Sequence, residues 1–265
     1  LILWILGMMV QGRLLEWELD RLRLFSNTLQ AIAAGYLIAC VLLLSSSLRT
    51  QIAATVALLL SYCLLLEFMP IPGRGAGHLE PTNNLALYVD ELVLGRFRDG
   101  TTYTWVLSSL GFGATVMMGA LAGHVLRARH TQLRKFQILA AAGVVCLAAG
   151  WAWGLWHPII KHIWTSSMNL WACGWSLLLL AGFYYVIDMR GYRKWAFPLI
   201  VIGMNAIAAY VATHLFDFQD LGDVFVGALK ERWGRLGIFL SAFGGLLLPW
   251  LLLLYMYRKK TFVRL

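Results

Sequence analysis

Long apolar runs alternate with short polar stretches along the whole chain. A helix needs about 20 predominantly apolar residues to cross a bilayer. Seven runs reach that length, at residues 27–46, 51–69, 103–126, 136–155, 165–188, 195–216 and 236–257. The pattern predicts an all-α fold, a polytopic transmembrane helical bundle with seven complete spans.

The first ten residues, "LILWILGMMV", are apolar but too short to cross a membrane alone. They lack the basic start and the small-residue cleavage site of a signal peptide. They also lack an initiator Met, so we expect a partial eighth span that begins within a longer protein. Residues 1–265 are then a single integral membrane domain, a fragment of a larger bundle truncated at its N-terminus.

Composition supports this class, because 60% of the residues are hydrophobic and only 13% are charged. The net charge of +9 would be compatible with nucleic-acid binding, but its distribution argues for topology instead. The loops at 45–50, 127–135 and 189–194 and the tail after 257 carry twelve Lys and Arg against one acid, Asp188. Excess Lys and Arg marks the cytoplasmic side. We therefore expect a multi-pass protein with a cytoplasmic C-terminus and no nucleic-acid partner. The absence of an N-x-S/T sequon fits a bacterial inner membrane.

The outer segment 77–95, "GHLEPTNNLALYVDELVLG", is polar but patterned. Over residues 84–94, five apolar side chains fall on one face of a helix, namely Leu85, Tyr88, Val89, Leu92 and Val93. This spacing predicts an outer-face amphipathic helix. We expect the apolar face to pack on the bundle and Asp90 to point toward polar partners or a cavity mouth. The helix is either a structural lid or a wall of a substrate site.

Polar side chains inside or beside membrane spans are costly and therefore candidates for function. Asn205 lies in the middle of a span, where an interhelical hydrogen bond and a ligand contact are equally compatible with the sequence. Asn27 opens a span and suits a helix cap. The full set of candidate substrate- or cofactor-binding residues is Asn27, Gln30, His78, Asn84, Asp90, Lys161, Asn169 and Asn205.

The sequence indicates no metal site, because no HExxH motif or paired-cysteine spacing occurs. The four cysteines, Cys40, Cys63, Cys146 and Cys173, all lie in apolar runs. Four histidines map to the outer side, namely His78, His157, His162 and His214. A single interfacial His is more often structural than catalytic, and Glu67 at the end of a span can simply reach interfacial water.

Three motifs, "GHLEPTNNLALYVDELVLG", "KHIWTSS" and "GMNAIAAYV", occur in an order that resembles the heparan-α-glucosaminide N-acetyltransferase family. Its bacterial relatives include DUF5009 proteins and N-acetylglucosamine-related transporters. The resemblance covers essentially the whole chain. It implies a larger bundle that carries acetyl from cytosolic acetyl-CoA to the amine of a terminal glucosamine. The family's catalytic His precedes the matched region, so the resemblance assigns that role to none of the six histidines here.

The chain departs from the family at two places. Ala31 stands where relatives often carry Arg, and "RDGTTYTW" replaces an acidic turn before the span at 103–126. Acetyl transfer to an amine requires a base and hydrogen-bond donors for the oxyanion. Asn27, Gln30 and Asn205 suit the donors, whereas no residue stands out as the base.

Three functions therefore stay open. The first is a membrane acyltransferase-like protein that uses acetyl-CoA and an amino sugar or glycan. The second is an amino-sugar or N-acetylglucosamine transporter of the same fold, which needs only polar groups around a gated cavity. The third is a non-catalytic membrane scaffold. The expected partners are the lipid bilayer and the sugar, and a homo-oligomer is also left open.

Overall fold

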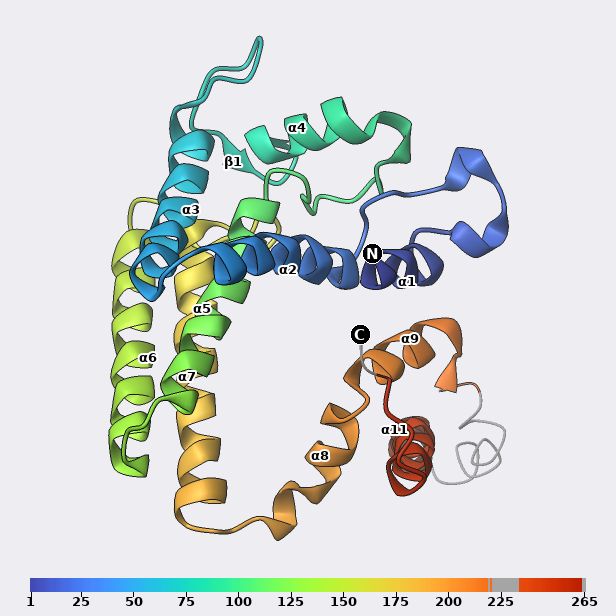
Figure 1. Ribbon diagram of the computed structural model, residues 1–265. Helices are drawn as coiled ribbons and strands as arrows, with labels where there is room; N and C mark the ends of the chain where they lie inside the picture. Colours follow the sequence, from blue (N-terminus) through green and yellow to red (C-terminus); the bar gives the residue numbers. More distant parts are fainter. Residues whose placement is uncertain (219, 221–233, 264–265) are drawn as a thin grey trace. The chain divides into compact units, whose positions relative to one another are not determined.

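The computed structural model describes residues 1–218, 220 and 234–263 and is mostly helical (Figure 1). The chain divides into two compact units, Leu1–Gly191 and Tyr192–Leu265. The first unit contains the helices α1 (Ile2–Val10), α2 (Thr28–Ser45), α3 (Leu48–Phe68), α4 (Leu85–Leu94), α5 (Ser109–Arg127), α6 (Gln132–Gly154) and α7 (Ser166–Phe183). Short 3-10 turns lie at Leu14–Glu16, Leu19–Arg21 and Gly95–Phe97. A two-stranded antiparallel sheet pairs β1 (Leu79–Glu80) with β2 (Asn83–Asn84).

The second unit contains a 3-10 turn at Lys194–Ala196, followed by α8 (Phe197–Gly203), α9 (Ala206–Leu215) and α11 (Arg235–Arg258). Asn205 separates α8 from α9 in a non-helical conformation, with φ −134° and ψ 38°. Its side-chain amide donates to the Thr261 carbonyl at 3.1 Å and accepts from the Val263 N–H at 2.9 Å. The residue in the middle of the predicted span at 195–216 thus holds the chain that follows α11.

Six helices in the described part of the chain are long and apolar enough to cross a membrane. They are α2, α3, α5, α6, α11 and α7 with its π-helical extension to Met189. The pair α8–α9 makes a seventh only if it counts as one span, because its two halves bend by 63°. The protein is therefore a multi-pass helical membrane protein. The span expected at 195–216 is thus interrupted at Asn205.

The span expected from residue 103 begins only at Ser109. The reason is that N–H groups before Ser109 donate to distant partners instead of carbonyls of their own segment. Trp105 and Val106 donate to the Asp90 carboxylate at 2.8 Å each, and Thr104 donates to the His162 carbonyl at 3.2 Å. Residues 103–108 are thus held as an extended and turning segment.

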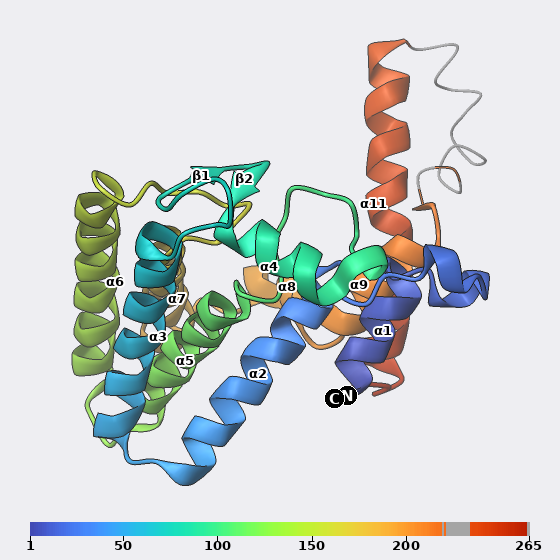
Figure 2. The same cartoon turned by 90° about the horizontal axis from the view of Figure 1, so that it is seen from above.

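Close helix packing holds the first unit together, and α6 and α7 lie side by side in both ribbon views (Figures 1 and 2). Glycine permits the approach: a Cβ on Gly150 would lie 2.7 Å from the Trp171 backbone nitrogen, and one on Gly174 would lie 2.8 Å from that of Leu147. Small residues at such positions allow membrane helices to pack backbone to backbone.

The helix expected at 84–94 is present as α4, and it buries only part of the expected face: Leu85 is buried, and Tyr88 and Val89 pack against the same cluster. Ala86 and Asp90 are fully buried and Leu94 is nearly so, whereas Leu92 is 72% and Val93 60% exposed. The expectation that Leu92 and Val93 lie on the packed face is wrong. The physical reason is the pair of hydrogen bonds from residues 105 and 106 to Asp90, which turns that side of α4 toward the bundle.

Candidate functional site

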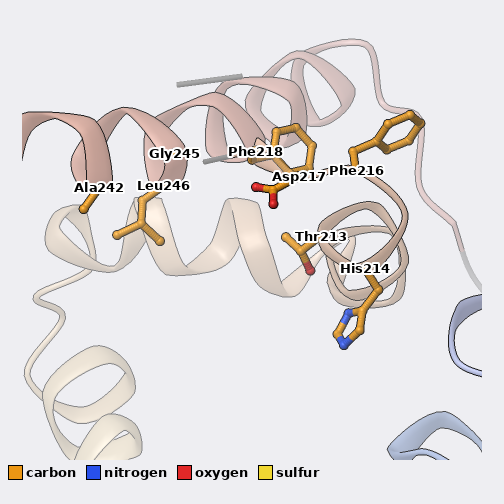
Figure 3. A pocket seen from close by; sticks show the side chains of 8 residues that line it. All are labelled: Thr213, His214, Phe216, Asp217, Phe218, Ala242, Gly245 and Leu246. Carbon is orange, nitrogen blue, oxygen red and sulfur yellow. The ribbon is translucent and has the colours of Figure 1, made fainter. Parts of the chain in front are cut away.

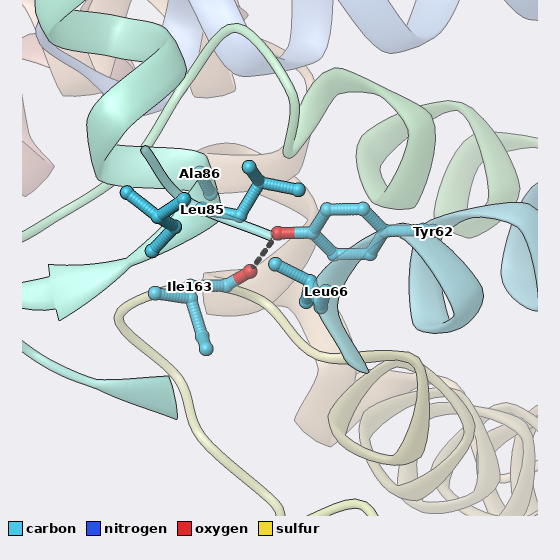
Figure 4. Close-up of a cluster of buried hydrophobic side chains, with 6 residues drawn as sticks. Tyr62, Leu66, Leu85, Ala86 and Ile163 are labelled. Atoms are coloured by element: carbon cyan, nitrogen blue, oxygen red, sulfur yellow. Dashed lines mark hydrogen bonds between the residues drawn. The ribbon is translucent and has the colours of Figure 1, made fainter. Parts of the chain in front are cut away.

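A group of buried hydroxyls connects α3, α5 and the loop before α7. We call Tyr62, Thr104 and Ser108 the hydroxyl cluster. The Tyr62 hydroxyl donates to the Ile163 carbonyl and lies 2.9 Å from the Ser108 hydroxyl, which is 2.6 Å from that of Thr104. Figure 4 shows Tyr62 pointing at this carbonyl among Leu66, Leu85 and Ala86. Each hydroxyl in the cluster has a partner, so the cluster binds the three elements together.

Asn169, on α7, is also fully engaged. Its amide nitrogen donates to the carbonyls of Trp164 and Thr165 at 3.1 and 3.3 Å. Its carbonyl oxygen accepts from the Trp164 indole N–H at 2.9 Å and from the Thr115 hydroxyl. Gly111 leaves room for this arrangement, since a Cβ there would lie 2.9 Å from the Asn169 amide nitrogen. The polar atoms of Asn169 are therefore used to join α5 and α7.

Asp90 receives the two N–H groups that precede α5, as described above. Burial raises the pKa of Asp90 to about 6, while the hydrogen bonds from Val106 and Trp105 act in the opposite direction. Asp99 has a similar position, because it accepts from the Trp105 indole N–H at 3.1 Å and from the backbone N–H of Thr101. Asp90 thus has polar partners, as the sequence predicted, and those partners are backbone groups.

The remaining amides close helix ends and turns. Asn27 caps α2 through the N–H groups of Leu29 and Gln30, and its amide donates to the Gly7 carbonyl at 2.7 Å. Gln30 bonds the backbone of Ser26 and Leu24. Asn84 caps α4 through the Leu87 N–H at 2.8 Å. The prediction that Asn27 caps a helix is confirmed.

The other two candidates lie near the surface. The His78 ring is 2.7 Å from the Arg74 carbonyl within its own loop, and Lys161 is exposed. The candidates within the first unit are therefore distributed over separate structural contacts instead of lining one described cavity. Among the described residues, no group of three or more His, Cys, Asp or Glu side chains is placed to hold a metal ion.

The structure brings together two residues that the sequence did not connect, Glu67 at the end of α3 and His157 after α6. His157 Nδ1 lies 2.6 Å from Glu67 Oε1. The His157 side chain is fully buried, and that of Glu67 is 13% exposed. Glu67 therefore does not simply reach interfacial water. The two residues are 90 positions apart, and only their location at span ends predicted to lie on the same side could have suggested a pair.

One atom of this pair has no partner. Among the described residues, His157 Nε2 is the one buried side-chain nitrogen or oxygen atom that has no hydrogen-bond partner. An ionised carboxylate can only accept, so the proton of the short contact belongs on Nδ1. In the neutral ring, Nε2 then carries a lone pair. The Trp153 and Trp156 rings lie beside the imidazole, with centroids at 6.3 and 6.2 Å.

The second unit contains a pocket of about 390 Å³ beside α9 and α11 (Figure 3). It is lined by Thr213, His214, Phe216, Asp217, Phe218, Ala242, Gly245 and Leu246. Two of its polar groups are used within α9: the Thr213 hydroxyl donates to the Ala209 carbonyl, and His214 Nδ1 lies 2.8 Å from the Tyr210 carbonyl. The pocket therefore gives weaker grounds for a site than the Glu67–His157 pair.

Neither a comparison with protein-family models nor one with curated proteins finds a match for the chain.

Proposed function

We propose that this chain forms the body of a membrane-embedded acyltransferase-like protein of the heparan-α-glucosaminide N-acetyltransferase type. It transfers acetyl from acetyl-CoA, a substrate, to the amine of an amino sugar. The observation that carries the proposal is the contact between two of the three motifs on which the resemblance rests. Leu85 and Ala86 of the first motif pack with Ile163 of the second in one buried cluster.

The contact continues through polar groups. Ser166 of the second motif donates to the Leu59 carbonyl on α3 at 2.7 Å, and the Ile163 carbonyl accepts from Tyr62 on the same helix. Asp90 of the first motif holds the segment before α5. The residues of the first two motifs therefore pack together at one end of the first unit. Residues that pack together are expected to occur together in proteins that share the fold. This supports family membership, and through it the acetyl-transfer chemistry.

A second function is favoured by a different observation. The bent pair α8–α9 breaks a potential span near its middle. Discontinuous membrane helices often form the binding sites of secondary transporters, where half-helix ends face the substrate. An amino-sugar transporter of the same fold is therefore the alternative.

A thiol-release assay separates the two functions. Full-length protein in liposomes, given acetyl-CoA and glucosamine, should release free CoA. N-acetylglucosamine is the matched control, because its nitrogen is already acylated and should give no release. Uptake of labelled N-acetylglucosamine without any release of thiol from the glucosamine reaction would favour the transporter. If neither thiol release nor sugar uptake is observed, the non-catalytic membrane scaffold is the remaining function.

A further inference from the structure

We propose that Cys146 and Cys173 form a redox-active pair, at which a reversible disulfide bond joins α6 to α7. The oxidant is a lipid-soluble quinone, because both thiols lie within helices that are long and apolar enough to cross a membrane. The proposal goes beyond acetyl transfer and does not depend on it.

The two thiols meet where α6 and α7 lie side by side (Figures 1 and 2). The side chain of Cys146, on α6, is hydrogen-bonded to that of Cys173, on α7. A thiol is both a weak donor and a weak acceptor, so the S–H of one cysteine points at the sulfur of the other. The two sulfur atoms are therefore direct neighbours across the helix interface.

The backbones also approach each other closely at this level of the interface. A Cβ on Gly174 would lie 2.8 Å from the backbone nitrogen of Leu147, and these are the residues that directly follow the two cysteines. One turn before Cys146, a Cβ on Gly143 would lie 3.1 Å from the Gly174 carbonyl oxygen. A disulfide requires Cα atoms within about 7 Å of each other. Contact between the two backbones beside the cysteines is compatible with that requirement.

The pair lies at the edge of the interface. The glycines that make the backbone contacts, Gly143, Gly150 and Gly174, are buried, whereas both cysteines are only half-buried. The exposed side of a membrane-spanning helix is the side that lipid reaches. Cys146 also lies about 12 Å along the helix axis from the end of α6 at Gly154, at about 1.5 Å per residue. An oxidant that dissolves in the bilayer therefore has access to the thiols.

Cysteine also occurs in helix packing as a small apolar residue, without any redox role. The other two cysteines fit that role, because Cys40 and Cys63 lie on α2 and α3, each of which contains no second cysteine. Cys146 and Cys173 differ from them by the hydrogen bond between their thiols. Packing alone requires no such contact, since Ala or Ser would occupy similar space.

The proposed step balances in atoms and electrons. The S–H bonds of Cys146 and Cys173 break, and one S–S bond forms between the two sulfur atoms. Two electrons and two protons pass to one quinone, which becomes a hydroquinone. In the reverse direction, exchange with a dithiol reagent restores both thiols, and the reagent takes up the disulfide.

Oxidation in liposomes that contain the whole protein and decylubiquinone, a lipid-soluble quinone, tests the site. Remaining thiols are then alkylated with a maleimide under denaturing conditions, and the tryptic peptides are identified by mass spectrometry. The four cysteines fall on four different tryptic peptides, 24–49, 50–74, 136–161 and 162–190. We expect 136–161 to be linked to 162–190, one hydroquinone to form per disulfide, and dithiothreitol to remove the link. Cys40 and Cys63 should be recovered as alkylated thiols.

Cys146→Ser and Cys173→Ser should each abolish the link. Cys40→Ser is the matched control, because Cys40 also lies in a membrane-spanning helix and is exposed. The link should form in this variant as in the wild type.

Copper phenanthroline, which catalyses oxidation of thiols by dioxygen within membranes, separates the two parts of the proposal. A link between Cys146 and Cys173 with this reagent but not with decylubiquinone would overturn the quinone as the oxidant. Four alkylated thiols after both treatments, or a link from either residue to Cys40 or Cys63, would overturn the pair itself.

Discussion

Two groups of buried polar side chains in the first unit differ in one respect. The hydroxyl cluster and Asn169 satisfy their polar atoms within the protein, whereas the Glu67–His157 pair leaves Nε2 open. Both groups lie among residues that join α3, α5, α6 and α7. The difference indicates that the first group serves stability, since its bonds end on backbone and neighbouring side chains. The second leaves one buried nitrogen without a partner.

The largest expected effect tests Asp90, whose carboxylate also has hydrogen-bond partners but is ionisable. Burial places its pKa at about 6, above the ordinary value of 3.8. The folded state therefore binds the Asp90 proton more tightly than the unfolded state. The resulting stabilisation is fully present below pH 3.8 and is lost as pH rises through 6. At about 1.36 kcal/mol per pKa unit, the free energy of unfolding falls by about 3 kcal/mol over this range.

Asp90→Asn is the control for this prediction, because it cannot titrate. The free energy of unfolding of the wild type, minus that of the variant, should fall as pH rises from 4 to 7. A difference that stays constant or increases with pH would show that Asp90 is not held by burial in the way described.

Asn169→Ala should lower the free energy of unfolding by about 2 kcal/mol, because it removes the buried hydrogen bonds of the Asn169 amide to Thr115, Trp164 and Thr165. Unfolding in mixed micelles, followed by tryptophan fluorescence, would measure this. Ser176→Ala is the control on the same helix, since its hydroxyl is exposed and bonds only the Ala172 carbonyl. Equal effects of both changes would argue against a satisfied core at Asn169.

Tyr62→Phe should have a smaller effect, about 1 kcal/mol. The change removes one hydroxyl, and Ser108, 3.4 Å from the Ile163 carbonyl, can partly replace it. Tyr36→Phe provides the comparison, because Tyr36 is 54% exposed. The hydroxyl cluster would lose its assigned role if Tyr62→Phe unfolded at the same denaturant concentration as the wild type.

The smallest effect on stability is expected for the double variant Glu67→Met with His157→Phe. Replacing a buried polar pair by apolar residues of similar volume is often neutral or stabilising. We expect a change of less than about 1 kcal/mol in the free energy of unfolding. Strong destabilisation would place the pair in the structural group.

The hydrophobic pattern alone predicted much of the architecture. Six of the expected spans, which correspond to α2, α3, α5, α6, α7 and α11, are present within a few residues of the expected bounds. The exception is the start of α5, which begins six residues late at Ser109. The helix at Leu85–Leu94 and the cap at Asn27 also follow from local sequence. These features depend on segment length, periodicity and side chains that bond their own backbone within a few residues.

Tertiary structure decided the rest. The face that α4 buries and the start of α5 depend on the Asp90 carboxylate meeting N–H groups 15 and 16 residues later. The bend at Asn205 depends on a tail 56 and 58 residues away. The Glu67–His157 pair joins residues 90 positions apart. The sequence by itself determined where helices form, because helix formation in a membrane is governed by local hydrophobicity and backbone hydrogen bonding. Which polar atoms meet, and which one is left unpaired, is decided by packing between distant segments, and no local pattern encodes it.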